Sequence, residues 1–137
     1  KSDQDRYFKN LFSKIFNEKK TSNILFSYMF KNKCIGYGGL VHIDWENKNA
    51  EISFIMETEL EKDFFSFHWQ IFLKQIEKVA FQELGFKKIY TYAFDLRPHL
   101  YDAIEKAGMV KEAELKEHRI INNEYRSVVI HSKYNGK

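Results

Sequence analysis

Ala50-Glu51-Ile52-Ser53-Phe54-Ile55-Met56 predicts a strand, and the rest of the chain is best understood from this run because a long helix follows it directly. From about Leu60 to Leu84 apolar residues recur every three or four positions, which predicts that helix, and Gly85 is placed to end it. Residues 87–94 are again rich in β-branched and aromatic residues and predict a second strand. Two strands joined through a helix pair in parallel, so residues 50–94 predict a β-α-β crossover.

Further elements are predicted on both sides of this crossover. Their order is helix, three strands, long helix, strand, helix and two strands, which predicts an α/β fold with a mixed central sheet flanked by helices. The ranges are 3–16 for the first helix, 23–30, 34–45 and 50–56 for the first three strands, 98–106 for the last helix, and 109–121 and 125–132 for the last two strands.

Length and composition narrow the class of protein. The 137 residues have no internal repeat, so we expect a single domain over residues 1–137. A hydrophobic share of 44% with 30% charged residues excludes a disordered or membrane-buried chain. The net charge of +3 is too balanced to require a nucleic acid or an anionic membrane as partner. Cys34 is the only cysteine and no signal peptide is visible, so we expect a cytoplasmic location.

Several short runs, in their order and spacing, resemble the GNAT superfamily of N-acetyltransferases, and most closely its ribosomal-protein and spermidine acetyltransferase branch. The first strand of that family has no counterpart, which we expect to reflect an N-terminal truncation. The matching runs are Ile35-Gly36-Tyr37-Gly38-Gly39-Leu40, Asn49-Ala50-Glu51-Ile52-Ser53-Phe54, Glu105-Lys106-Ala107-Gly108-Met109, Glu114-Leu115-Lys116-Glu117-His118 and Asn122-Asn123-Glu124-Tyr125-Arg126.

The resemblance implies a GNAT-like fold and transfer of an acetyl group from acetyl-CoA to a primary amine, which we expect to be a small amine, an amino sugar or a protein N-terminus. In that family acetyl-CoA lies between the fourth and fifth strands where they part. Strand amides bind its thioester carbonyl, and the N-terminus of the next helix binds its pyrophosphate. The resemblance thus implies acetyl-CoA contacts from the backbone of Phe54, Ile55 and Met56.

The glycine loop that binds the pyrophosphate in the family has no counterpart here, because no glycine occurs between Gly39 and Gly85. Only glycine lets the backbone approach a phosphate so closely. The run Phe64-Phe65-Ser66-Phe67-His68-Trp69 stands in that region. Either this bulky run is simply core, or Lys62, Ser66 or His68 contacts a phosphate in place of the loop.

The tyrosine that protonates the departing CoA thiolate in the family aligns with Ile104, which cannot do so. Tyr101 lies three residues earlier, on the same face of the predicted helix, and we predict that it is the substitute acid. The alternative is a core tyrosine. The preceding segment concentrates polar side chains after a strand end, where α/β sheets place ligands. We predict that Asp95 and Arg97 bind the cofactor and His99 the substrate; alternatively, Asp95 caps the helix and the other two are solvated.

Glu51 is the predicted general base, because an amine arrives as an ammonium and transfer needs a proton acceptor at the attack site. It lies on the strand that lines the family's acetyl-CoA site, on the face of Ser53 and Ile55. The alternative is a surface carboxylate paired with a lysine. The five histidines show no metal-ligand spacing, so no metal is expected.

A second class of function competes with the enzyme. The missing glycines favour a GNAT-fold binding or assembly module that has lost acetyl-CoA, whereas Glu51 and the polar segment around Tyr101 favour catalysis. An aromatic share of 17% is high for so short a chain, and exposed aromatic patches mark interfaces. We therefore also expect a homodimer.

Overall fold

The computed structural model describes residues 21–56, 58–94 and 98–136, with the backbone alone described at residues 58–63 and 98–99. The predicted helix over 3–16 lies outside this range. The described strands form one six-stranded sheet of order β1-β2-β3-β4-β6-β5. β3 and β4 are parallel and every other neighbouring pair is antiparallel, which confirms the predicted mixed sheet. The strands are β1 (Ile24–Phe30), β2 (Lys33–Asp44), β3 (Asn49–Met56), β4 (Lys88–Phe94), β5 (Val110–Ile121) and β6 (Glu124–Tyr134).

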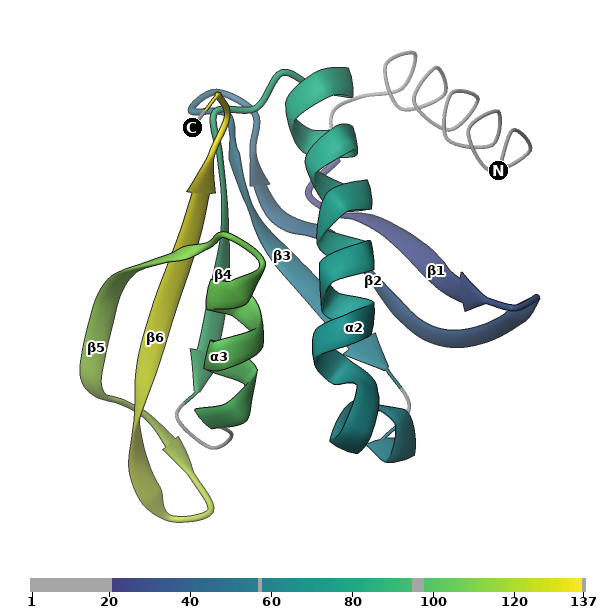
Figure 1. Ribbon diagram of the computed structural model, residues 1–137. Coiled ribbons are helices and arrows are strands. Elements are labelled where there is room, and N and C mark those ends of the chain that lie inside the picture. The colour runs from purple at the N-terminus through teal and green to yellow at the C-terminus, as the bar shows by residue number, and fades with distance from the viewer. Residues whose placement is uncertain (1–20, 57, 95–97, 137) are drawn as a thin grey trace.

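Two helices of the described range cover one face of this sheet, α2 (Thr58–Glu77) and α3 (Pro98–Lys106) (Figure 1). The predicted long helix is confirmed, but its last turn is the π-helical segment η1 (Lys78–Glu83), in which Leu84 N–H donates to Val79 O at 3.0 Å. Gly85, with φ of +68°, ends it as predicted. No helix within the described range is long and apolar enough to cross a membrane.

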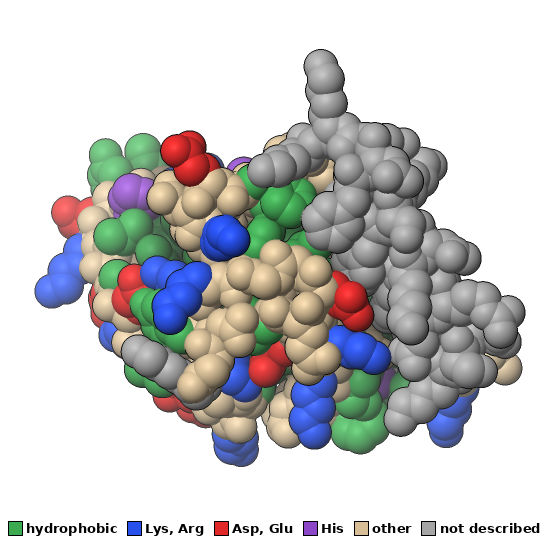
Figure 2. All heavy atoms as spheres, turned by 90° about the horizontal axis from the view of Figure 1, so that it is seen from above, with side chains coloured by type: hydrophobic (Ala, Val, Ile, Leu, Met, Phe, Trp, Pro, Cys, Tyr) green, Lys and Arg blue, Asp and Glu red, His purple; other side chains and the backbone are tan. Residues whose placement is uncertain are grey.

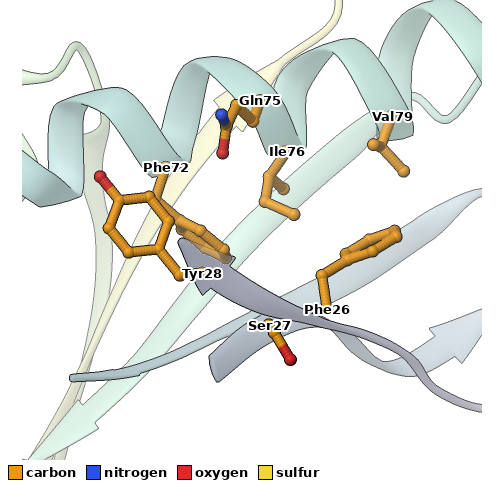
Figure 3. A pocket seen from close by; sticks show the side chains of 7 residues that line it. All are labelled: Phe26, Ser27, Tyr28, Phe72, Gln75, Ile76 and Val79. Carbon is orange, nitrogen blue, oxygen red and sulfur yellow. The ribbon is translucent and has the colours of Figure 1, made fainter. Parts of the chain in front are cut away.

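Aromatic side chains fill the layer between α2 and the sheet, which accounts for much of the aromatic richness of the chain. The Phe54 ring of β3 stacks on the Phe72 ring of α2, with centroids 4.2 Å apart and planes 13° from parallel. Gly38 on β2 makes room for this stack, because a Cβ there would lie 2.5 Å from Phe72 Cζ. Figure 3 shows Tyr28 and Phe72 side by side in a small pocket between β1 and α2, while Ser27 points away from the helix.

The surface is mixed in charge where Figure 2 displays it. Lysine and arginine side chains lie there beside aspartate and glutamate, so the described residues of this end present both signs of charge. Exposed apolar side chains lie on the sheet face opposite α2, at Leu25, Met29, Tyr37 and Ile55. These four residues alternate with inward-facing ones along β1, β2 and β3.

One polar pair is buried within the aromatic layer. His68 is 3% exposed and Tyr28 is 4% exposed, and the Tyr28 hydroxyl lies 2.9 Å from His68 Nδ1 in a hydrogen bond. Burial raises the pKa of Tyr28 and lowers the pKa of His68 below its ordinary 6.5. The folded protein therefore holds His68 in its neutral form.

Stability should consequently depend on pH through His68. The unfolded chain takes up a proton as the pH falls through about 6.5, whereas folded His68 resists protonation, so the free energy of unfolding should fall below that pH. Urea unfolding at about pH 7.5 and at about pH 5.5 measures this loss. His68→Gln keeps a hydrogen-bonding side chain without titrating, and its loss on acidification should be smaller. Equal losses in both proteins would contradict the assignment to His68.

Candidate functional site

β3 and β4 part in the middle of the sheet. They pair over only three positions, Asn49 with Lys88, Ala50 with Ile89 and Glu51 with Tyr90, although both strands continue further. Beyond Glu51, β3 follows α2 through the stack of Phe54 on Phe72, whereas β4 stays paired with β6 as far as Phe94. Figure 1 shows the two strands diverging beneath the helices.

A cavity of about 390 Å³ lies where the strands part. It opens through the sheet, because Ile52 and Phe54 of β3 face the helices while Glu51, Ser53 and Ile55 face the opposite side. A ligand from one face can therefore meet a ligand from the other. Its walls are Glu51, Ile52, Ser53, Phe54 and Ile55 of β3, Thr91, Tyr92, Ala93 and Phe94 of β4, Phe65 and Trp69 of α2, and Leu100 and Ile104 of α3.

Two polar atoms in this wall are buried without a partner. Trp69 is 3% exposed and Thr91 is 6% exposed, and neither Trp69 Nε1 nor Thr91 Oγ1 has a hydrogen-bond partner among the described residues. Most buried polar groups in proteins are paired, and leaving one unpaired costs about 1–3 kcal/mol. The pair is therefore suited to a ligand that brings hydrogen-bonding groups of its own into the cavity.

Glu51 stands at the mouth of the cavity on the side away from the helices. Its side chain is 18% exposed, and its Oε1 accepts a hydrogen bond from His42 Nδ1 at 2.7 Å. The alternative of pairing with a lysine is therefore wrong, since the partner is a histidine from β2. Burial and then the Glu51 charge raise the pKa of Tyr90, the β4 residue opposite Glu51. The Glu51 carboxylate therefore lies beside both the cavity and the Tyr90 ring.

Tyr101 does not line the cavity, contrary to the expectation that it shares a face with Ile104. Its ring lies against His131 of β6, with centroids 5.7 Å apart. At 100° per residue, Leu100 and Tyr101 lie on opposite sides of Ile104 around the helix, and the cavity is on the Leu100 side. The predicted role of Tyr101 as an acid stays a prediction.

The bulky run that replaces the glycine loop divides between core and surface. Phe65, His68 and Trp69 are buried, whereas Phe64 and Phe67 are exposed. A phosphate contact by His68 is wrong, because His68 is buried and bonded to Tyr28.

The structure describes only some of the other residues that were predicted to contact acetyl-CoA or the substrate. Ser66 lies well inside α2, where its Oγ accepts from Gln70 Nε2 at 3.4 Å, and it is not among the cavity residues. Met56 is 5% exposed and also does not line the cavity, while Phe54 and Ile55 do. Asp95, Arg97 and the side chains of Lys62 and His99 lie outside the described residues.

The residues missed by the sequence are Trp69, Thr91 and His42. Trp69 fits the apolar period of its helix and Thr91 the alternation of its strand, so neither stands out from structural positions. Among the described residues, no group of three or more histidine, cysteine, aspartate or glutamate side chains is arranged to hold a metal ion.

The parted parallel strands, with a carboxylate at the mouth of the cavity between them, are the arrangement that the resemblance predicted for an acetyltransferase. The family model described as "Acetyltransferase (GNAT) domain" matches residues 1–130. The chain therefore belongs to the GNAT family of acetyltransferases. No curated protein matches the sequence.

Solved structures share this fold. A mutant form of the spermidine/spermine N-acetyltransferase SpeG from Vibrio cholerae is 22% identical, with a TM-score of 0.76 over 96% of this chain and 77% of that one. A dodecameric spermidine N-acetyltransferase from Vibrio cholerae has the same identity of 22% and TM-score of 0.76, over 96% of this chain and 75% of that one. A probable acetyltransferase is 16% identical, with a TM-score of 0.73 over 94% and 68%.

Proposed function

We propose that the cavity between β3 and β4 binds acetyl-CoA and that the protein transfers its acetyl group to a primary amine. The observation that carries this proposal is the pair of unpartnered buried atoms, Trp69 Nε1 and Thr91 Oγ1, in a cavity that opens through the sheet. The pantetheine arm of acetyl-CoA is a narrow chain with amide groups and a thioester, so it fits a slot between strands and offers hydrogen-bonding groups along its length.

The residues of the cavity fit this arm. Trp69 Nε1–H can donate to a carbonyl, and Thr91 Oγ1 can either donate or accept. Beyond Glu51 the backbone of β3 has no pairing with β4, which leaves the strand edge at Phe54 and Ile55 for the thioester carbonyl and the arm. Apolar walls from Phe65, Leu100 and Ile104 exclude water from the rest of the slot.

Bound acetyl-CoA supplies a thioester carbon open to attack and a thiolate leaving group. Glu51 takes a proton from the incoming ammonium, which frees the lone pair of the amine for attack. Strand N–H groups of β3 donate to the carbonyl oxygen as negative charge develops on it.

The acceptor is a small amine, an amino sugar or a protein N-terminus. Spermidine and spermine, the substrates named for the similar Vibrio cholerae structures, are primary amines and are the first acceptors to test. The single Cys34 suits a reducing compartment, so a cytoplasmic location belongs to this proposal. A homodimer belongs to it too, supported by the exposed apolar residues on the sheet face opposite α2.

The competing proposal is a GNAT-fold binding or assembly module that has lost acetyl-CoA. It is supported by the absence of glycine between Gly39 and Gly85, because the family binds the pyrophosphate with a glycine loop. The two proposals differ in whether acetyl-CoA binds at all.

Calorimetric titration with acetyl-CoA separates them, and two variants locate the site. Trp69→Phe and Thr91→Val remove the unpaired polar atoms, so each should weaken acetyl-CoA about 2- to 10-fold. Thr91→Val keeps the shape of the side chain and should not lower the stability of the free protein, whereas Trp69→Phe also loses ring contacts in the core. Trp45→Phe is the matched control, since its indole N–H already donates to Thr21 O at 2.5 Å. It should cost stability and leave affinity unchanged. No heat and no thermal stabilisation at millimolar acetyl-CoA would favour the assembly module.

Glu51→Gln tests the general base. The amide keeps the shape of the side chain but cannot accept the ammonium proton, so kcat/KM for the amine should fall about 10²- to 10⁴-fold and its rise with pH should flatten. Affinity for acetyl-CoA should stay as in the wild type. Glu124→Gln removes a carboxylate paired with Arg126 on the β5–β6 hairpin and should leave turnover unchanged. Wild-type turnover in Glu51→Gln would assign the base to another group.

Tyr101→Phe tests the predicted proton donor to the CoA sulfur. The variant keeps the ring against His131 but lacks the hydroxyl. If Tyr101 is the acid, kcat should fall about 10²- to 10⁴-fold when the chemical step limits the rate, with acetyl-CoA affinity unchanged. A wild-type kcat would instead give Tyr101 the role of packing α3 on β6, and His99 would be the next residue to substitute.

A further inference from the structure

His42 reaches Glu51 through an irregularity of β2. Val41 pairs with Glu51 and Asp44 pairs with Asn49, so β2 has one more residue than β3 over this interval. The extra residue forms a β-bulge, and His42 within it has a φ of +49°. A positive φ is uncommon for a residue other than glycine and is strained.

The bulge decides which face His42 occupies. Side chains alternate along a regular strand. Val41 pairs with Glu51 and faces away from the helices, so the next residue, His42, would face the helices in a regular strand. Instead its Nδ1 lies 2.7 Å from Glu51 on the opposite face, and the next residue, Ile43, packs against the core. Ile43 N–H donates to Ser22 O at 3.0 Å, which anchors the strand just beyond the bulge. β-Bulges beside active sites often redirect a side chain in this way.

We propose that His42 is a positioning residue for Glu51. This inference rests on the proposed acetyltransferase function. The His42 Nδ1–H donates to Glu51 Oε1 and fixes the carboxylate, which leaves Oε2 to receive a proton from the ammonium. The neutral amine then attacks the thioester carbon, the new C–N bond forms as the C–S bond breaks, and the products are the acetamide, CoA thiol and one released proton.

Two variants separate the hydrogen bond from the backbone strain. His42→Gly accepts the positive φ without strain but has no donor, whereas His42→Asn tolerates the same φ and keeps an N–H near the position of Nδ1. Amine acetylation is measured for both and for the wild type from about pH 6 to about pH 9, together with thermal stabilisation by acetyl-CoA.

His42→Gly should lower kcat/KM for the amine about 10-fold at about pH 8, mainly through KM, and His42→Asn should restore most of that loss. All three proteins should be stabilised equally by acetyl-CoA.

The outcomes separate the failure of this inference from the failure of the proposed function. If the wild type acetylates amines and His42→Gly matches it at every pH, the positioning role is wrong and the transferase stands. If the two variants lose activity alike, so that His42→Asn rescues nothing, the effect is structural and the role is again wrong. If acetyl-CoA stabilises none of the proteins, or stabilises them without turnover of any amine, the proposed transferase fails and the role of His42 fails with it.

Discussion

Phe54 and Phe72 stack with ring centroids 4.2 Å apart, and this contact ties the second half of β3 to α2. Gly38 permits the close approach, because any side chain there would occupy the space of the Phe72 ring. β4 meanwhile remains paired with β6 to its end at Phe94. The pairing of β3 with β4 ends at Glu51, and the cavity lies between the two strands beyond that point. Phe54 lines the cavity as well as stacking on Phe72, so the aromatic core forms part of the wall of the site.

The parted strands join two different environments. On the helix side the cavity is apolar apart from Trp69 and Thr91, which suits the arm of an acyl donor. On the opposite side Glu51 and His42 present polar groups to solvent, which suits an amine that arrives with a charge. Alternation along β3 produces this separation, since neighbouring residues such as Glu51 and Ile52 point to opposite faces. Donor and acceptor can therefore meet in the plane of the sheet without sharing an entrance.

Most of the fold could be predicted because its signals are local. Each strand range follows from β-branched and aromatic runs, and the crossover through α2 fixes β3 and β4 as the parallel pair. The face of Glu51 followed from alternation alone. The side of α3 on which Tyr101 lies could not be predicted. Tyr101 is about 60° around the helix axis from Ile104, and this angle is enough for Ile104 to line the cavity while Tyr101 packs against β6. The β-bulge at His42 has no signal in the sequence, since its backbone is set by the packing of Ile43 and by pairing with β3.

Three features that are locally unfavourable occur together around the parted strands. Trp69 Nε1 and Thr91 Oγ1 are buried without partners, and His42 has a positive φ that its residue type rarely adopts. Each costs free energy in the folded protein, and none is needed to close the core. Such departures also occur elsewhere, since Arg126 Nε and His131 Nδ1 on β6 are buried without a described partner and Glu117 on β5 has a φ of +48°. What distinguishes Trp69 and Thr91 is that both residues line the cavity. The proposal that this cavity holds a ligand therefore rests on where these two polar atoms lie, because a polar group of a ligand is what would satisfy them there.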